Sequence, residues 1–542
     1  MIRVGYFALV FFGLLAFFNA IRHPFVHDDV VFILNNPHIT ELESWAEAFK
    51  VPAASGGINT YYRPVLEILY RFEYHFFGPH PFGFHLFNVI VHIINGLLLF
   101  GLLQRLGLRE AAAWVIACVF LIHPVQTEAV SCISGISNLW MALGVLLALH
   151  AYLNRWYTAA LLCFAMAFLS KEQAVMFVPL LMVIDYSRGE KNFCLWLFGA
   201  VFACILLWLR QSVTGASLFK DIMLSPGELY LRLAAIPRVM GMDLRLIFCP
   251  YDLHYYRSTD ILQANGIAWI LALISMGGIF YVLHRWPRAR PTLILGFGWF
   301  LAALLPVLNV APLINEYSFI LTPEHFLYLP MVGILIVVVV SADTLFFHNS
   351  LGRHTRHSQL FVIPAKAGIF KKLLLGVVVG SCLLLTWYQN TFWRSEIALF
   401  ERMLRFEPDF GRGHLLLAKA YYFNGRPQDA DKHFGKAFMI MSAYARKASN
   451  LTAEKFYLGF VKEILFDWAQ NDSARGYWTG ALDKYKRAAV IDGKDASLYN
   501  NMAFVYLHGG DKKDAYLSLK QALRIDPSFA QARRNLQILG TP

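Results

Sequence analysis

Two carboxylates, Asp28 and Asp29, stand side by side a few residues after the first apolar stretch of the chain. A carboxylate can take a proton from a hydroxyl group as a general base, or it can bind a divalent cation. Adjacent residues in an extended loop point to opposite sides, so we expect the two acids to differ in role. The structural alternative is that Asp29 caps a short helix that starts at Val30.

Charged residues at two further places could meet an anion. Arg63 follows two tyrosines in the same polar segment as the acids, and it could contact a phosphate or form a local ion pair. Lys171 and Glu172 stand between two apolar runs, where a charge exposed to lipid is costly and therefore functional or paired. We expect Lys171 to bind phosphate, with a Lys171–Glu172 ion pair as the alternative.

The histidines give a weaker signal. His123 and Glu128 fall at the end of an apolar run and could line a site, although a histidine followed by proline also ends a helix. His85 and His92, seven residues apart, share one helix face. We expect these two to be hydrogen-bonded core residues rather than ligands.

The elements that position these residues follow from composition. Of the 542 residues, 57% are hydrophobic and 15% charged, and the mean hydropathy is +0.48. Soluble proteins carry about 25% charged residues, so this composition indicates a membrane protein. About eleven apolar stretches approach the ~20 residues that span a bilayer. They lie near 4–20, 84–104, 111–123, 138–154, 157–169, 173–185, 192–210, 265–284, 292–308, 325–342 and 372–390.

Basic residues in the short loops set the orientation, because they favour the cytoplasmic side. A cytoplasmic N-terminus puts one set of basic residues on that side: Arg105, Arg109, Arg155, Arg188, Lys191, Arg285, Arg288, Arg290, Arg353, Arg356, Lys371 and Lys372. An odd number of spans then places the C-terminal tail outside. The first apolar segment is expected to be a retained helix rather than a signal peptide, since a phenylalanine stands where cleavage needs a small residue.

Two long polar segments, 21–83 and 211–264, then become external loops. Transporters keep short loops and polar sites near the middle of the bilayer. This chain instead carries its polar residues at the outer surface, which predicts a substrate whose reactive group lies at headgroup depth.

The polar tail beyond residue 390 shows a period of 34 residues, which is typical of tetratricopeptide repeats. Ala481 and Ala515 are one period apart, whereas about 17 extra residues separate Ala430 from Ala481. We therefore predict an all-α protein with two domains: a polytopic helix bundle over 1–390 and an α-solenoid of repeats over 391–542. Such solenoids bind peptides or partner proteins. The tail's basic excess fits either an acidic partner or a solvated surface.

Several classes of chemistry lack support. The seven cysteines show neither a CxxC pair nor Cys/His zinc spacing, and no phosphate-loop or dinucleotide fingerprint occurs. The sequence predicts no particular cofactor and leaves a divalent cation open. No nucleic-acid partner is expected.

Six motifs in order resemble the transmembrane and tetratricopeptide-repeat O-mannosyltransferase family, within the GT-C glycosyltransferases. They are HDDVVFILNN at 27–36, YYRPV at 61–65, PFGFHLFNVIVH at 81–92, HPVQTEAVSCISG at 123–135, SKEQAV at 170–175 and EHFLYLP at 324–330. The resemblance covers nearly the whole chain. The chain departs from the family pattern at Ile136 and at His325, and the family has an arginine at both positions.

The resemblance implies a GT-C fold and an acid of the first external loop beside a lipid-phosphate sugar. A polyprenyl phosphate is a good leaving group and needs no general acid, whereas a hydroxyl acceptor needs a base. We therefore assign the base to Asp28 and a structural or metal-binding role to Asp29, with the reverse left open.

The departing phosphate requires cations, which we expect from three residues, and other residues should line the site. The cations are Arg63, Lys171 and His325, and the lining residues are Tyr62, His123, Glu128, Glu172 and Glu324.

The implied function is transfer of mannose or another hexose from a polyprenyl-phosphate donor to a protein Ser/Thr hydroxyl, with the repeats recruiting the acceptor. The alternatives are a lipid-linked oligosaccharide ligase or oligosaccharyltransferase, and a non-catalytic membrane scaffold. Segment 353–372 resembles peptide encoded by repetitive DNA inserted into bacterial reading frames. We accordingly expect a bacterial inner-membrane protein whose tail is periplasmic.

Overall fold

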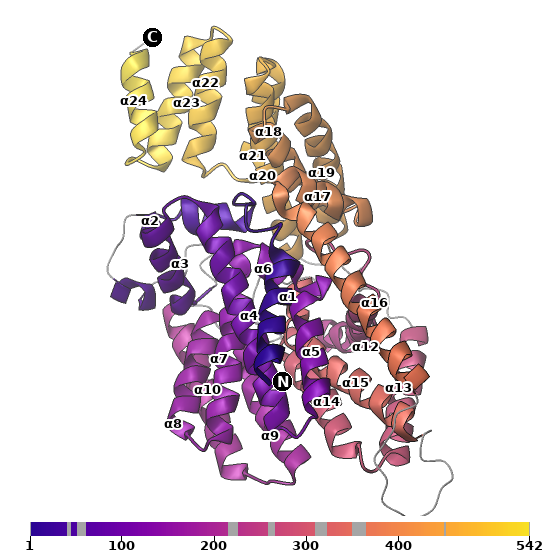
Figure 1. The fold of residues 1–542 in the computed structure, drawn as a ribbon. Coiled ribbons are helices and arrows are strands. Elements are labelled where there is room, and N and C mark those ends of the chain that lie inside the picture. Colours follow the sequence, from indigo (N-terminus) through magenta and orange to yellow (C-terminus); the bar gives the residue numbers. More distant parts are fainter. Residues whose placement is uncertain are drawn as a thin grey trace, which may run out of the picture. The chain divides into compact units, whose positions relative to one another are not determined.

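A computed structural model describes residues 2–40, 45–50, 61–214, 226–257, 266–308, 310, 322–348, 365–448 and 451–540. Within those ranges the chain is helical and has no strand, which confirms the all-α class. The chain divides into two compact units, Met1–Ser395 and Glu396–Pro542. Each is described separately below (Figure 1).

The first unit is a bundle of helices (Figure 1). Its main helices are α1 (Ile2–Phe17), α3 (Pro64–Phe77), α4 (Pro81–Arg105), α5 (Glu110–Ile122), α6 (Thr127–Ser131), α7 (Ile136–Leu153), α8 (Tyr157–Ser170), α9 (Phe177–Arg188), α10 (Phe193–Thr214), α12 (Pro226–Phe248), α13 (Gly266–Arg285), α14 (Arg290–Leu304), α15 (Pro330–His348) and α16 (Ala365–Asn390). Short elements that matter for the site are the π-helix η1 (Val30–Leu34), α2 (Pro37–Thr40) and the 3₁₀-helices η2 (Trp45–Phe49), η4 (Ile133–Gly135), η5 (Glu172–Met176), η8 (Glu324–Leu327) and η9 (Thr391–Arg394).

In the described part of the chain, 6 helices are long and apolar enough to cross a membrane, namely α4, α7, α10, α13, α14 and α16. The count rises to 7 if the pair formed by α5 and the segment Pro124–Ser131, bent by 51°, is one span. The apolar helices α1, α8 and α15 are shorter. The expected count of about eleven therefore stays a prediction.

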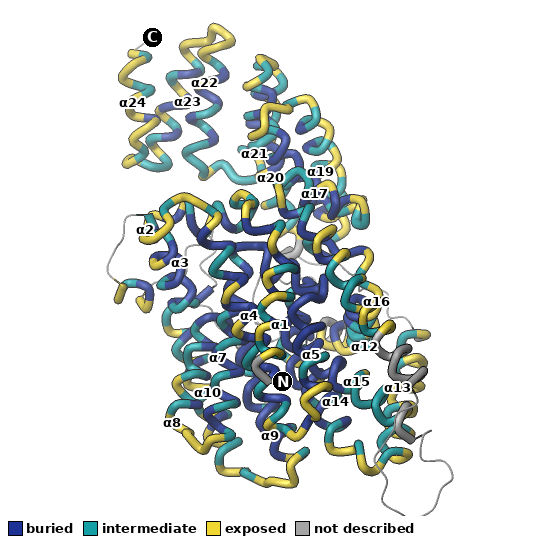
Figure 2. Tube along the Cα trace, viewed as in Figure 1, coloured by how far each residue is buried: buried dark blue, intermediate teal, exposed yellow. Residues whose placement is uncertain are grey.

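Burial separates the core helices from the peripheral ones. In α7, 72% of the apolar window is buried, whereas in α13 the share is 0% (Figure 2). A helix that is apolar yet uncovered by protein has lipid as its natural neighbour. The bundle is thus built around α4, α5 and α7, with α10, α13 and α16 more exposed.

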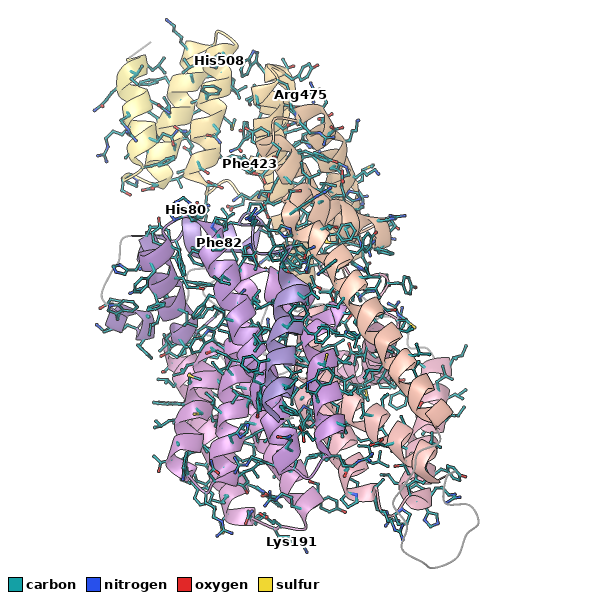
Figure 3. All side chains as sticks on the ribbon, viewed as in Figure 1. His80, Phe82, Lys191, Phe423, Arg475 and His508 are labelled. Carbon is teal, nitrogen blue, oxygen red and sulfur yellow. The ribbon has the colours of Figure 1, made fainter. Side chains whose placement is uncertain are left out.

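The short basic loops meet at one end of this bundle. Arg105 Nη2 donates to Asn154 Oδ1 at 2.6 Å, which joins the turn after α4 to the turn after α7. Arg109 pairs with Asp343 near the end of α15. Lys191 lies at this end, whereas His80 and Phe82 lie at the opposite end (Figure 3). The basic loops therefore share an end, as the charge pattern predicts. Residues 353–364 of the predicted cytoplasmic loop lie outside the described ranges.

Helices α14 and α15 pack backbone against backbone at a pair of glycines. A Cβ added at Gly296 would lie 2.8 Å from the Gly333 carbonyl oxygen, and one added at Gly333 would meet Gly296 O and Phe300 N. Small residues at such contacts let apolar helices approach closely enough for strong van der Waals packing. This pair fixes the start of α15, which directly follows η8.

The two long segments that the sequence predicts to be external loops contain helices. Segment 21–83 contains η1, α2, η2 and α3, with 41–44 and 51–60 outside the described ranges. Segment 211–264 contains α12, a helix of 23 residues that begins at Pro226 and includes Pro237. Hydropathy does not reveal α12 because charged residues interrupt its apolar positions.

The second unit is a series of paired helices: α17 (Glu396–Phe406), α18 (Gly411–Phe423), α19 (Pro427–Lys447), α20 (Leu451–Ala474), α21 (Trp478–Ile491), α22 (Ala496–His508), α23 (Lys512–Ile525) and α24 (Ala530–Leu539). The repeat alanines Ala430, Ala481 and Ala515 are all fully buried. The extra residues between the first two copies lengthen helices rather than form a loop: α19 has 21 residues and α20 has 24, against 14 in α21 and 13 in α22.

Candidate functional site

Asp28 and Asp29 begin a helical turn rather than lie in an extended loop. His27, with φ 48°, turns the chain into this helix, which continues as η1. The Asp28 side chain is 41% exposed, with Oδ1 3.3 Å from His27 Nε2. Its Oδ2 accepts a hydrogen bond of 3.2 Å from the Tyr255 hydroxyl. The expectation of different environments for the two acids holds, although the backbone differs from the one assumed.

Asp29 is fully buried and joins two parts of the chain. Its Oδ1 accepts from Ser134 N at 2.7 Å and its Oδ2 accepts from Val26 N at 3.1 Å, and the Cys132 thiol lies 3.6 Å from Oδ1. Its side chain makes no capping bond to η1, so the helix-cap alternative is wrong. Burial raises the pKa of Asp29 to about 6, against the opposing effect of the two backbone donors.

Arg63 and Lys171, two of the predicted cations, have partners that are distant in sequence. Arg63 forms a bidentate pair with Glu172, with Nε–Oε2 and Nη2–Oε1 distances of 3.1 and 3.0 Å, and its guanidinium lies 4.4 Å from the Tyr61 ring centre. Lys171 donates from Nζ to Asn138 Oδ1 at 2.7 Å. Glu172 therefore pairs with Arg63, 109 positions away, rather than with its neighbour Lys171.

Electrostatics around this group favour a bound anion. Although burial opposes it, Arg63 lowers the pKa of Glu172 to about 2, so that carboxylate stays charged. Burial, followed by the nearby Arg63 guanidinium, lowers the pKa of Lys171 to about 7. Lys171 donates to the neutral amide of Asn138, which does not cancel the ammonium charge. An anion beside Lys171 would restore its full protonation.

His325 and Glu324, from the motif at the start of η8, face different partners. His325 Nδ1 lies 2.8 Å from Glu128 Oε1, and His325 N donates to Glu128 Oε2 at 2.9 Å. Burial lowers the pKa of His325, and Glu128 opposes this. Glu324 Oε1 accepts from His254 N at 2.6 Å and lies 3.6 Å from Arg257 Nη2. Burial, followed by the Glu128 carboxylate, raises the pKa of Glu324.

Tyr62 and His123, which the motifs suggested as lining residues, form internal contacts. The buried Tyr62 donates from its hydroxyl to Phe49 O at 3.1 Å. His123 Nε2 lies 2.9 Å from Ile247 O, and His123 Nδ1 accepts from Val125 N at 3.2 Å. Both ring nitrogens of His123 are thus occupied by backbone groups, which leaves this side chain a structural role.

The two histidines of α4 are buried and hydrogen-bonded. His85 Nε2 lies 3.1 Å from His23 O, and His92 contacts the Tyr328 hydroxyl at 2.7 Å and Leu121 O at 3.1 Å. Both therefore act as polar core residues. Among the described residues, no group of three or more His, Cys, Asp or Glu side chains could hold a metal ion.

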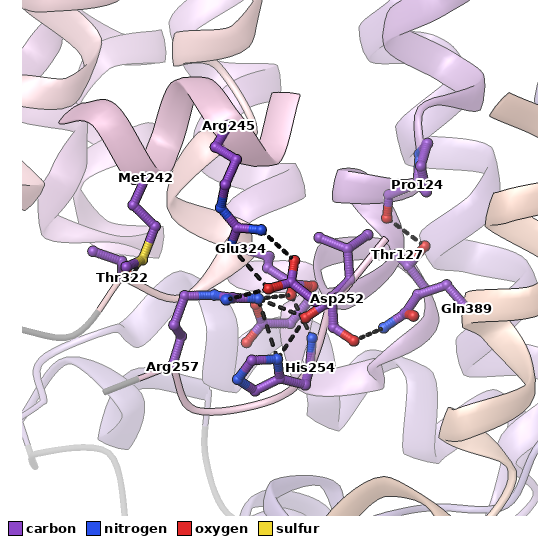
Figure 4. Close-up of polar contacts among 12 residues, drawn as sticks. Pro124, Thr127, Met242, Arg245, Asp252, His254, Arg257, Thr322, Glu324 and Gln389 are labelled. Carbon is purple, nitrogen blue, oxygen red and sulfur yellow. Dashed lines mark hydrogen bonds and ion pairs between the residues drawn. The ribbon is translucent and has the colours of Figure 1, made fainter. Parts of the chain in front are cut away.

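The structure adds residues that the motifs did not assign. The amide oxygen of Asn138 is the acceptor for Lys171. Tyr255 contacts Asp28. Glu324 contacts the backbone N of His254 and the guanidinium of Arg257, which in turn pairs with Asp252 (Figure 4). The only sequence signal for this second group was the concentration of aromatic and charged residues in segment 211–264.

The fold and these contacts define a helical membrane protein with a polar site at one end of its bundle and a tail of helical repeats. No family model matches the chain. Curated relatives carry the name protein O-mannosyl-transferase. One, F38B6.6 of Caenorhabditis elegans, is 23% identical over 80% of this chain and 62% of its own length. TMTC4 of Mus musculus is 24% identical over 78% of this chain and 65% of its own length.

Another relative, TMTC1 of Mus musculus, is 34% identical over 26% of this chain and 15% of its own length. The chain thus spans less than two thirds of the length of the first two relatives. Their names confirm the family resemblance that the six motifs suggested.

Solved structures similar to this chain include two that cover 26% of it. They are the crystal structure of MamA, with TM-score 0.22 and 20% identity, and that of YrrB, described as a TPR protein with an unusual peptide-binding site, with TM-score 0.16 and 16% identity.

Proposed function

We propose that this chain is a membrane glycosyltransferase that moves mannose, or another single hexose, from a polyprenyl-phosphate donor to a protein hydroxyl. The observation that carries the proposal is the contrast between the two acids. Asp28 is partly exposed and contacts the polar side chains of His27 and Tyr255. Asp29 is buried and accepts hydrogen bonds from backbone amides. The names of the relatives support a mannosyl donor and a protein acceptor.

The chemistry needs one base and one anion site. Asp28 accepts the proton of the acceptor hydroxyl as its oxygen attacks the anomeric carbon of the sugar. The bond from that carbon to the phosphate oxygen breaks, and the polyprenyl phosphate leaves with the electron pair. Lys171 holds the phosphate, because its ammonium charge is not cancelled by Asn138. Arg63 adds positive potential, although it is also paired with Glu172. His325, whose pKa burial lowers, adds positive charge only when it is protonated.

The location follows from the charge pattern. We place the Asp28 end of the bundle and the repeat tail on the periplasmic side of a bacterial inner membrane, because the basic loops gather at the other end. The lipid-linked donor then reaches Asp28 from the outer leaflet, and the repeats present the protein acceptor. Segments of α19, α21 and α23 with buried alanines support a packed solenoid that can serve as this platform.

The test is transfer by the purified protein in vesicles that contain polyprenyl-phosphate mannose, with a Ser/Thr-rich protein acceptor read by mass spectrometry. Addition of one hexose supports the proposal. Addition of an oligosaccharide from a lipid-linked oligosaccharide donor supports the ligase alternative, and no transfer from either donor supports the scaffold.

Asp28→Asn keeps the size of the side chain and removes its basicity, so transfer should fall by about 10²- to 10⁴-fold. Glu47→Gln is the matched control, because Glu47 is a partly exposed acid of the same external segment, 38% exposed and paired with Lys50. Wild-type turnover by Asp28→Asn would refute the base assignment.

A further inference from the structure

The segment between α12 and the next described helix is tied down by charged side chains. We call residues 249–257 the strap. Arg245 at the end of α12 forms a bidentate pair with Asp252, with distances of 3.0 and 2.9 Å. Arg257 contacts the same residue, at 3.1 Å to Oδ2 and 2.7 Å to the backbone oxygen. Asp252 therefore links the end of α12 to the last residue of the strap (Figure 4).

Two other elements hold the middle of the strap. Glu324 of η8 accepts from His254 N at 2.6 Å, and Gln389 of α16 donates to Leu253 O at 3.1 Å (Figure 4). Leu253 and His254 are almost completely buried. Immobilising an irregular segment costs conformational entropy at every residue. Buried ion pairs do not by themselves repay such a cost, because removing charges from water is expensive. We therefore attribute these buried contacts to the positioning of the strap rather than to stabilisation of the fold.

The residue that the strap carries toward the acids is Tyr255. Its hydroxyl donates to Asp28 Oδ2 at 3.2 Å, and its ring packs edge-on against His27 and Trp393, with centres 5.4 and 5.9 Å apart. The tyrosine comes from a segment more than two hundred residues away from Asp28 in sequence. Tyr255 is partly buried, and so is the hydrogen bond that its hydroxyl donates to Asp28.

Backbone strain marks both sides of this contact. Among the described residues, the non-glycine residues with positive φ are His27, Arg155 and Tyr256. His27 directly precedes Asp28, and Tyr256 directly follows Tyr255. A side chain in the left-handed region is unfavourable and persists only where the surroundings enforce it. Strained residues on both sides of the Asp28–Tyr255 hydrogen bond indicate that the surrounding structure enforces this contact, as is typical of functional sites.

We propose that Tyr255 is a positioning residue for Asp28, and that Glu324 sets the position of Tyr255 through the strap. This inference rests on the proposed function, in which Asp28 is the base. The tyrosine hydroxyl occupies one lone pair of Oδ2 and fixes the plane of the carboxylate. A carboxylate has about four lone-pair sites, so room remains for the proton of the acceptor hydroxyl. Glu324, expected from its motif to line the donor site, acts instead from behind the strap.

The first test is Tyr255→Phe, which removes only the hydroxyl. We expect kcat to fall about 10- to 100-fold, the range for a hydrogen bond to a charged group, with the KM for polyprenyl-phosphate mannose unchanged. Tyr251→Phe is the control: Tyr251 lies on the same strap, is exposed, and keeps its ring over Arg245.

The second test separates this inference from the proposed function. In the Asp28→Asn background, Tyr255→Phe should cost nothing further, because the two residues act as one unit. An inactive Asp28→Asn with a wild-type kcat in Tyr255→Phe would overturn the inference and leave the base intact. Full activity of Asp28→Asn would overturn the proposed function itself.

The third test concerns Glu324. Glu324→Ala removes the acceptor for His254 N and should reproduce the kcat loss of Tyr255→Phe, with donor KM unchanged. Glu324→Gln keeps an acceptor oxygen at the same place and should recover most of the activity. A raised donor KM in Glu324→Gln with a normal kcat would instead place Glu324 at the donor and refute its positioning role.

Discussion

Lys171 offers a sharp test of the anion site, because burial makes its charge depend on pH near neutrality. Burial and the neighbouring Arg63 lower its pKa to about 7. A phosphodiester keeps its single negative charge over the whole neutral range, so only the protein titrates there. Donor binding requires the ammonium form, and therefore binding takes up a proton whenever the free enzyme is deprotonated.

The sign and size of the effect follow from this linkage. Below pH 7 the lysine is charged and donor affinity should be constant. Above pH 7 the protonated fraction falls, and the dissociation constant should rise about tenfold for each pH unit, equal to about 1.4 kcal/mol. The rise ends above the pKa of Lys171 in the donor-bound protein, where the bound lysine also loses its proton.

The assay is calorimetric titration of a short-chain polyprenyl-phosphate mannose into the protein in detergent. Buffers of different ionisation heat report the number of protons taken up, which should approach one at pH 8 and zero at pH 6. Lys171→Arg should bind with no pH dependence in this range, because guanidinium stays protonated. Asn138→Asp puts a carboxylate beside Nζ, where the amide oxygen now lies at 2.7 Å. That change should move the onset of weakening to higher pH and lower the affinity, since the new acid competes with phosphate. A flat dissociation constant from pH 6 to 9, or an unchanged slope in Lys171→Arg, would refute the reasoning.

Three further outcomes are expected. Ala503→Trp should destabilise the tail by about 1–3 kcal/mol through overpacking, because Ala503 is only 1% exposed; a thermal midpoint equal to that of the wild type would contradict this. A reporter active only outside the cytoplasm should be active after Pro542 and silent within 353–372, and the opposite pattern would move the acids to the cytoplasmic side. For Asp29, a folded pKa of about 6 above the usual 3.8 stabilises the fold at low pH, and about 3 kcal/mol should be lost as pH rises from 4 to 6; Asp29→Asn should remove this dependence, as thermal unfolding in detergent would show.

The tail provides a final test. The structure assigns Trp393 to the first unit, against Tyr255, so a truncation should begin at Glu396 rather than at residue 393. Removing 396–542 should leave donor binding intact and strongly reduce transfer to a folded protein acceptor, with a smaller effect on a short peptide. Loss of donor binding would show that the tail forms part of the site, and full activity on protein acceptors would exclude recruitment.

Sequence patterns predicted the features that depend on local periodicity. Hydropathy located apolar helices such as α4 and α7, and fixed offsets located repeat alanines such as Ala481, because helix packing allows only small residues there. The same reasoning missed α12, whose charged residues hide its helical character from a hydropathy scan.

Contacts between distant residues could not be predicted in this way. Nothing local pairs Arg63 with Glu172 or places Tyr255 against Asp28, since these partners come together only through the packing of separate helices. The difference between the acids was correctly expected, yet its cause was not alternation along an extended chain. His27 turns the backbone into a helix, and Asp29 is buried by its contacts with Ser134.

The glycine contact between α14 and α15 also limits which parts of the bundle can move. The glycine pair places the backbones of α14 and α15 in direct contact, so we expect these two helices to move together. η8 precedes α15 and contacts the strap through Glu324, so the strap should move with this helix pair. In the proposed function, the lipid-linked donor enters from the bilayer between helices that can separate. We therefore expect any gate for this lipid to involve helices such as α10 and α13, whose apolar surfaces the protein itself leaves largely uncovered.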